Sequence, residues 1–255
     1  MHWIQSKHLP TYLIEVNGLP ISYQKIGVGE PLILVHGLAG STRWWGRNVE
    51  SLAEQHCVYL VDLPGFGSMR RARASFALMR AGSWLLQWME ALGIQKAHLL
   101  GHSMGGFICL WIAAHHPERV LRMILVSPAI LHQVHALWGY LFPLLQGVRY
   151  LSIPFAWILL WDSLRMGPFT LLRAAQSLLK ENLGKEIEVV QAPTLLVWGE
   201  GDTIVPPSLG QVLRQKIHNA RLLIIKRAGH VSMFDQPQIF NQAANDFLAG
   251  KSVGE

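Results

Sequence analysis

The chain has 255 residues, 51% of them hydrophobic and 15% charged, with a formal net charge of +6. Its length fits one large α/β domain with a full core. The positive charge comes with no nucleic-acid motif, and apart from a cluster at 70–73 the basic residues are scattered. We therefore expect no binding to nucleic acid. We interpret the cluster as a solvated loop, and recognition of an anionic substrate group or lipid headgroup is the alternative.

Cysteine content and hydropathy limit the remaining classes of protein. Cys57 and Cys109 lie in apolar stretches and match no metal or redox spacing, so we expect two buried free thiols. The N-terminal stretch lacks an apolar core of signal-peptide length, and no uncharged apolar run is long enough to cross a bilayer. We expect a cytoplasmic protein without a spanning helix.

Apolar runs of strand length alternate along the chain with longer amphipathic segments. This α/β pattern predicts a mostly parallel sheet covered by helices on both faces. The chain opens with an expected antiparallel hairpin around the turn signal Asn17-Gly18, and the later runs are nearly continuous in apolar residues, as in fully buried strands. After the hairpin the expected strands are 32–36, 58–62, 96–101, 123–127, 194–199 and 221–226, and the expected helices are 75–92, 104–115, 207–217 and 237–249.

One segment, from residue 130 to 186, breaks this alternation. No strand–turn–helix unit can be drawn in it, and it is rich in Trp, Leu and Phe and interrupted by prolines. The sheet pattern resumes at Pro193. We predict a helical cap at 130–186 that lies over the strand ends of a core domain formed by 1–129 and 187–255.

The sequence Gly101-His102-Ser103-Met104-Gly105 is a G-x-S-x-G motif between an expected strand and an expected helix. A nucleophile held above a sheet needs a sharp, strained strand-to-helix turn, and small residues must flank it because strand and helix come close. Glycines at 101 and 105 meet that need, and a helix N-terminus favours developing negative charge. The context predicts Ser103 as a nucleophile, with the side chain of His102 pointing away from the site; a plain glycine-rich turn is the alternative.

A second motif, His36-Gly37-Leu38, follows the apolar run LILV. Gly37 lets the chain turn so that the N–H of Leu38 points into the site beside the N–H of Met104. These two donors predict an oxyanion hole, which stabilises the negative charge that develops during acyl transfer. For His36 the alternative is a structural histidine that closes a strand.

A catalytic acid and base are expected after the serine, in that order. Asp202 follows the expected strand 194–199, and His230 follows the expected strand 221–226. The intervals leave room for the intervening strands, cap and helix. We predict that Asp202 orients His230, which takes the proton of Ser103 and returns it to the leaving group.

Two other carboxylates are candidates for the catalytic acid that orients His230. Glu200 neighbours Asp202 and stays open as an alternative, although it is nearer the strand. Asp62 also ends a strand but precedes the serine, and we interpret it as a carboxylate that ties down the turn at 64–67.

Five motifs together resemble the α/β-hydrolase superfamily: HGLAG, DLPGFGS, GHSMGG, the GEGD that contains Asp202 and the AGH that contains His230. They stand in order over nearly the whole chain, with the cap as the exception. The resemblance implies an eight-stranded sheet, a helical lid and an acyl-enzyme mechanism, which requires no cofactor or metal. It does not imply a substrate.

The serine nucleophile argues against dehalogenases and epoxide hydrolases, whose family nucleophile is aspartate. The GHSMGG motif looks like that of small carboxylesterases and monoacylglycerol lipases, so we expect hydrolysis of a hydrophobic ester with a small or medium acyl group. C–C bond hydrolases of aromatic degradation are the first alternative, but they typically carry a tryptophan after the histidine, where this chain has Met233 and Phe234. A non-catalytic binder of an apolar ligand is the second, and a perhydrolase side activity also stays open.

Aromatic residues of the cap are expected to line the substrate pocket, because apolar linings hold hydrophobic acyl groups by burying their area. The alternative is that they only pack the cap onto the core. A third interpretation is an apolar surface patch that touches a membrane together with Arg149 and Arg165. The predicted substrate-contacting residues are His36, Gly37, Trp138, Phe142, Trp157 and Trp161.

Overall fold

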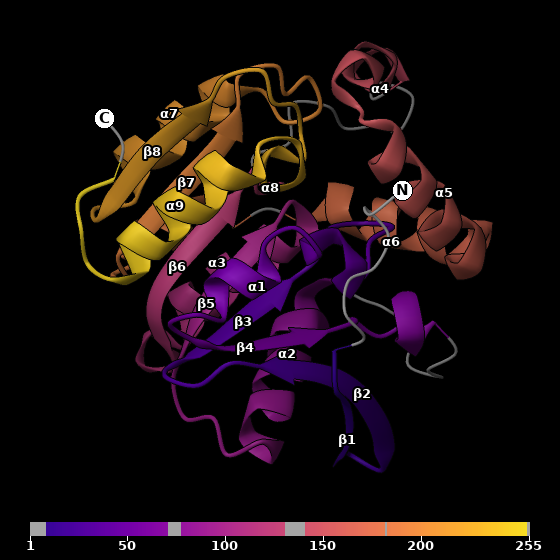
Figure 1. Cartoon of the computed structure of the whole chain (residues 1–255), viewed down its shortest axis with the longest axis vertical. Helices are drawn as coiled ribbons and strands as arrows, with labels where there is room; N and C mark the ends of the chain where they lie inside the picture. Colours follow the sequence, from indigo (N-terminus) through magenta and orange to yellow (C-terminus); the bar gives the residue numbers. More distant parts are fainter. Residues whose placement is uncertain (1–8, 71–77, 131–140, 182, 254–255) are drawn as a thin grey trace.

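The structure, a computed structural model, describes residues 9–70, 78–130, 141–181 and 183–253. Within these ranges the chain forms an eight-stranded sheet with strand order β1-β2-β4-β3-β5-β6-β7-β8 (Figure 1). β2 pairs antiparallel with β1 and β4, and the later pairings are parallel, which confirms the expected mostly parallel sheet. The strands are β1 (Thr11–Val16), β2 (Leu19–Ile26), β3 (Pro31–Val35), β4 (Cys57–Val61), β5 (Ala97–His102), β6 (Val120–Val126), β7 (Thr194–Gly199) and β8 (Ala220–Ile225).

The central strands are apolar on both faces because both faces are covered. In β3, Ile33 and Val35 belong to one buried cluster, whereas Leu32 and Leu34 belong to a second. Successive side chains of a strand point to opposite faces, so the two clusters are the two halves of the core. This arrangement explains why the strand sequences lack an apolar–polar alternation.

Helices cover both faces of the sheet, as expected. The helices α2, α3 and α7 contribute side chains such as Ile108 to the cluster that holds Ile33, whereas α1 and α9 contribute side chains such as Phe240 to the other cluster. α7 and α9 each begin with a proline, which fits the first helical turn because its missing N–H has no intrahelical acceptor there. Their bounds are α1 (Val49–Leu52), α2 (Leu78–Ala91), α3 (Met104–His115), α7 (Pro207–Lys216), α8 (Ser232–Asp235) and α9 (Pro237–Leu248).

Between β6 and β7 the described part of the chain contains helices and no strand. These are α4 (Leu141–Gly147), α5 (Ile153–Met166) and α6 (Pro168–Lys180), and α5 packs against α6 at one side of the molecule (Figure 1). Gly167 joins α5 to α6 with φ 82°, a conformation that glycine adopts without strain. The division into a core and a cap with boundaries at 130 and 186 stays a prediction.

α5 is attached to the loop that follows β3. Its buried carboxylate, Asp162, accepts a hydrogen bond of 2.7 Å from Ser41 Oγ and forms an ion pair with Arg43. On the same helix the ring of Phe155 packs edge-on against Trp44 at a centroid distance of 4.9 Å. These contacts fix one side of α5 beside the carboxyl end of β3, where the functional side chains gather.

Candidate active site

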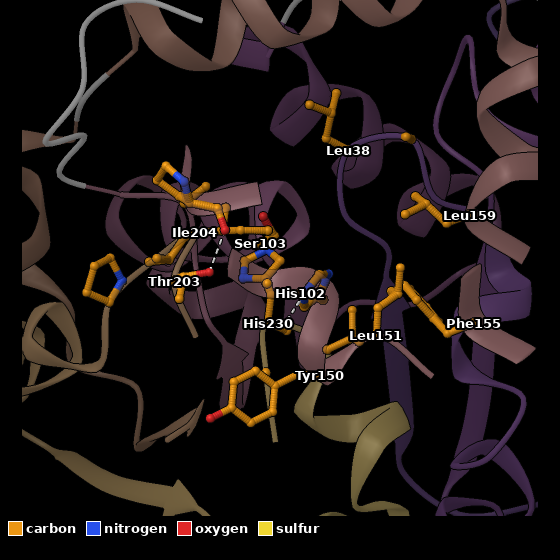
Figure 2. A pocket seen from close by; sticks show the side chains of 18 of the residues that line it. Leu38, His102, Ser103, Tyr150, Leu151, Phe155, Leu159, Thr203, Ile204 and His230 are labelled. Atoms are coloured by element: carbon orange, nitrogen blue, oxygen red, sulfur yellow. Dashed lines mark hydrogen bonds between the residues drawn. The ribbon is translucent and has the colours of Figure 1, made fainter. Parts of the chain in front are cut away.

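Ser103 occupies the turn between β5 and α3 with φ 50° and ψ −112°. A positive φ is strained for a residue with a Cβ, so the surroundings must enforce it. The N–H of Ser103 donates to Val126 O at 2.9 Å, and its carbonyl accepts from the N–H groups of Phe107 at 3.1 Å and Ala129 at 3.0 Å. These bonds tie the turn to β6 and to α3, and the nearly buried Ser103 lines a cavity (Figure 2).

Glycines make the close approach of strand, helix and loop feasible. A Cβ on Gly101 would overlap the carbonyl oxygen of Gly105, and a Cβ on Gly105 would overlap the end of β3. A Cβ on Gly37 would come within 2.6 Å of His102 Nδ1 and 3.3 Å of Ser103 Cβ. Gly37 thus allows the loop after β3 to lie against Ser103, but it does not line the cavity, in contrast to the prediction that it contacts substrate.

His230 and Asp202 are joined by a hydrogen bond. His230 Nδ1 donates to Asp202 Oδ2 at 2.9 Å, and the side chain of Asp202 has no exposed surface. The other oxygen, Oδ1, accepts from the N–H groups of Ile204 at 3.0 Å and Val205 at 2.9 Å. With its oxygens occupied in this way, the carboxylate is held in one orientation, and His230 reaches the same cavity as Ser103.

The two predicted oxyanion donors lie on segments that the structure brings to Ser103. Leu38 lines the cavity in a tight loop, in which the N–H of Gly40 donates to Gly37 O at 3.1 Å. Met104 opens α3 directly after Ser103, and the first N–H groups of a helix have no acceptor inside the helix. This arrangement suits donation to an oxyanion, while the buried side chain of Met104 packs in the core.

His36 does not line the cavity, in contrast to the prediction that it contacts substrate. It is buried, its Nε2 accepts the N–H of Leu63 at 3.1 Å, and its Nδ1 donates to Gly37 O at 2.8 Å. Burial lowers the pKa of His36, which favours the neutral ring that these two bonds require. The side chain holds the loop after β3 against the loop after β4, which matches the alternative of a structural histidine.

Asp62 fixes the same region, as the sequence indicated. Its Oδ1 accepts the N–H of Thr42 and its Oδ2 accepts the N–H of Ser68, both at 2.7 Å. A Cβ on Gly67 would overlap this carboxylate. Asp62 therefore ties the turn at 64–67 to the loop that contains Leu38.

His102 faces the site, and the expectation that it points away was wrong. Its Nε2 donates to the carbonyl oxygen of His230 at 3.0 Å, and the two rings lie 4.8 Å apart (Figure 2). Burial, and then the neighbouring His230, hold the pKa of His102 well below its usual value, so the ring is neutral. The side chain supports the backbone of His230, a role that the motif alone does not reveal.

The cavity has a volume of about 620 Å³ and is mostly apolar. It lies where the loops after the parallel strands meet the helical segment, which supplies residues from α5 and α6. Polar groups on its wall include Ser103, His230 and Thr203, whose hydroxyl donates to Pro143 O at 2.6 Å. The apolar side of the wall includes Leu38, Trp44, Ile130, Leu151, Phe155, Leu159, Leu171, Leu178, Leu179, Ile204 and Val205 (Figure 2).

Two of the four cap aromatics predicted to contact substrate lie away from the cavity. Trp157 and Trp161 are 67% and 54% exposed and do not line it. They share a face of α5 because they are four residues apart, and the cavity side of that helix carries Phe155 and Leu159 instead. Trp138 and the side chain of Phe142 lie outside the described part of the chain.

Asp235 lines the cavity, although no sequence pattern pointed to it. It lies in α8, and its Oδ2 accepts the N–H of Gly229 at 2.9 Å. Burial raises the pKa of Asp235 to about 6, against the lowering effect of that hydrogen bond, Arg47 and His230. A carboxyl group that titrates in this range adds a further ionisable group to the site of His230 and Asp202.

The described ranges contain no cluster of three or more His, Cys, Asp or Glu side chains placed to bind a metal ion. In the same ranges no helix has the length and hydropathy to cross a membrane. Cys57 and Cys109 are both free and buried, as the sequence predicted.

Comparison with known proteins gives consistent matches over the whole fold. A family model described as alpha/beta hydrolase fold matches residues 30–173, and one described as TAP-like protein matches residues 175–253. Pimeloyl-[acyl-carrier protein] methyl ester esterase of Aeromonas hydrophila is 28% identical, over 90% of this chain and 100% of that protein. 2-Hydroxy-6-oxo-6-phenylhexa-2,4-dienoate hydrolase of Comamonas testosteroni is 29% identical, over 96% of this chain and 94% of that protein. The crystal structure of a bacterial membrane phospholipase A is 27% identical with a TM-score of 0.82, covering 95% of this chain and 86% of that one.

Proposed function

The chain belongs to the alpha/beta-hydrolase fold family, and on this basis we propose that it is a serine hydrolase of hydrophobic carboxylic esters. One observation carries the proposal: the buried Asp202 holds Nδ1 of His230, and His230 shares an apolar cavity with the strained Ser103. A buried carboxylate oriented by two backbone N–H groups is the arrangement that keeps a histidine in the tautomer of a general base.

The proposed reaction runs through an acyl-enzyme. His230 Nε2 takes the proton from Ser103 Oγ as that oxygen bonds to the ester carbonyl carbon. The negative charge that develops on the carbonyl oxygen is stabilised by the N–H groups of Leu38 and Met104. The C–O bond then breaks, His230 returns the proton to the leaving alcohol, and a water molecule activated by His230 hydrolyses the acyl-enzyme.

The shape and lining of the cavity support an apolar acyl group. A volume of about 620 Å³ lies in the range typical of small-molecule sites, and the wall is mostly aliphatic and aromatic. Because α5 and α6 provide much of this wall, we propose that the helical segment at 130–186 acts as a cap that shapes the substrate pocket. The methyl ester esterase from Aeromonas, 28% identical and matched over its whole length, supports ester chemistry.

A C–C bond hydrolase is the second candidate, since the Comamonas enzyme is 29% identical over nearly the whole chain. Its substrate, by its name, is a hydroxy-oxo-phenylhexadienoate, an anion with a keto group. Such a carboxylate needs a cationic or strongly donating partner in the pocket, whereas here the cavity wall carries Asp235 as a further acid. This charge arrangement favours a neutral ester.

The test is hydrolysis of p-nitrophenyl esters from acetate to palmitate, with the wild-type protein and a Ser103→Ala variant. We expect hydrolysis that depends on Ser103 and an optimum at a medium chain length. An aromatic meta-cleavage product is assayed in parallel. Turnover of that compound without ester hydrolysis would favour the C–C hydrolase, and a folded protein that hydrolyses neither would favour a binder of apolar ligands.

A further inference from the structure

An apolar stripe on α5 faces solvent. Ile153, Trp157, Leu160, Trp161 and Leu164 recur at the spacing of one helix face, and each is about half exposed or more. Phe169 at the start of α6 adds to them, with 87% of its surface exposed. We call these six residues the α5–α6 apolar surface.

The opposite side of α5 is also apolar and has its own partners. Phe155 packs against Trp44 and Phe234, and Leu159 lines the cavity. α5 is therefore apolar on two opposite sides, and an apolar helix side is normally covered by protein or lipid. The inner side of α5 is covered by the core, whereas the outer stripe is an exposed apolar patch of the kind that marks an interaction surface.

The exposed charges of the helical segment at 141–180 have one sign. Across residues 141–180 the acidic residue is Asp162, and it is buried in its ion pair with Arg43. The exposed charges of that segment are Arg149, Arg165, Arg173 and Lys180, and the guanidinium of Arg165 lies 6.0 Å from the ring centre of Trp161. A helix pair with exposed tryptophans among cations is complementary to the headgroup region of an anionic bilayer, where indole rings and basic side chains are both favoured.

We propose that the α5–α6 apolar surface docks on an anionic lipid membrane, with its tryptophans in the headgroup layer and its arginines on the phosphates. The same two helices line the cavity on their inner side, so docking would place the cavity next to the lipid phase. This step rests on the proposed function: the substrate class would be esters dissolved in, or derived from, the bilayer. Binding itself requires no catalysis.

Binding is measured by co-sedimentation of the full-length protein with phosphatidylcholine vesicles, with and without phosphatidylglycerol. We expect binding only to the anionic vesicles, weakening as salt screens the charges. The double variant Trp157→Ser/Trp161→Ser should bind at least about tenfold more weakly because it loses apolar contact area. Arg165→Gln with Arg173→Gln should weaken binding by about fivefold for each arginine.

Matched controls remove equally exposed side chains from distant surfaces. Leu13 and Val28 are 73% and 82% exposed on and after the first strands, and the pair Leu13→Ser/Val28→Ser should bind vesicles like wild type. Lys96→Gln with Arg214→Gln, both at exposed positions, is the control for charge. Ser103→Ala should also bind like wild type, so that loss of hydrolysis and loss of docking are read separately.

Three outcomes would overturn the proposal. The first is wild-type protein that stays in solution with anionic vesicles. The second is that the control pairs weaken vesicle binding as much as the α5–α6 variants do. Binding would then depend only on the net charge or the overall hydropathy of the protein. The third is a dimer, seen by light scattering, that Trp157→Ser/Trp161→Ser dissociates while vesicle binding stays absent; the surface would then bind a second copy of the chain.

Discussion

Asp162 in α5 accepts a 2.7 Å hydrogen bond from the hydroxyl of Ser41, in the loop that also contains Leu38. The carboxylate is buried, and it pairs in addition with the half-exposed Arg43. A single side chain thus connects the helix that lines the cavity to the loop that carries a proposed oxyanion donor. Movement of α5 away from the core would break this connection.

Asp162→Ala should therefore loosen α5 and destabilise the protein. The change leaves the buried hydroxyl of Ser41 without its acceptor, and we expect a loss of about 1–3 kcal/mol in the free energy of unfolding. Thermal denaturation measures the loss, and limited proteolysis measures the opening of α5. Glu118→Ala, at an exposed acid, is the matched control and should change stability by less than about 0.5 kcal/mol. Equal stability and equal proteolysis of the two variants would show that the Asp162 contacts do not hold α5.

Gly105→Ala tests the close packing behind Ser103. The added Cβ would overlap the backbone at the end of β3, so the turn must shift. We expect destabilisation by about 3 kcal/mol, measured by chemical denaturation, and loss of ester hydrolysis. Gly46→Ala is the control, because the added Cβ would lie 3.3 Å from Arg43 O and the φ of −59° suits any residue. The free energy of unfolding of this variant should stay within about 1 kcal/mol of wild type. The idea fails if both substitutions have the same effect.

Asp235 should make stability depend on pH. Its ordinary pKa is 3.8, and burial raises the pKa in the folded protein to about 6. Between these two values the folded state keeps a proton that the unfolded state has lost, so stability falls as pH rises through this window. Above about 6 the penalty for burying the charge is fully present.

Asp235→Asn keeps an acceptor for the N–H of Gly229 and removes the charge. The variant should have a higher Tm than wild type at neutral pH, and the difference should vanish below 3.8. Thermal melts across this window measure the difference. A Tm difference that is constant over pH would contradict the assignment of this titration to Asp235.

Ala175→Phe tests whether the inner side of α6 limits the length of the acyl chain that the cavity accepts. Ala175 lines the cavity from α6, and a phenyl ring there would shorten the space for an acyl chain. We expect kcat/KM for long-chain p-nitrophenyl esters to fall by about tenfold, with acetate little changed. Gln176→Phe adds the same ring at the neighbouring exposed position and should leave the chain-length profile unchanged. A profile that both variants leave unaltered would place the acyl chain elsewhere.

Patterns that are local in the sequence predicted much of the architecture. The strands β3 to β7 are continuous apolar runs bounded by turn residues, so their positions were evident. The order of the motifs also placed Asp202 and His230 on neighbouring loops, and the structure joins them by a hydrogen bond. Ser103 has the positive φ that a sharp strand-to-helix turn requires.

Features decided by tertiary contacts were not predictable in this way. α5 is apolar on most sides, so its periodicity could not tell that Phe155 faces inward and Trp157 outward. The orientation of His102 depends on a carbonyl group 128 residues away, and the connection of Asp162 to Ser41 spans 121 residues. The raised pKa of Asp235 arises from burial, which its sequence neighbours do not encode.

Labelling with a fluorophosphonate probe tests whether Ser103 is a nucleophile that His230 and Asp202 activate. The serine oxygen attacks phosphorus and displaces fluoride, and mass spectrometry of the peptides locates the bond. We expect a label on Ser103, none on a folded Ser103→Ala variant, and labelling slowed by about 10⁴-fold in Asp202→Asn. A folded wild-type protein that takes up no label, or a label that persists in Ser103→Ala, would contradict this role of Ser103.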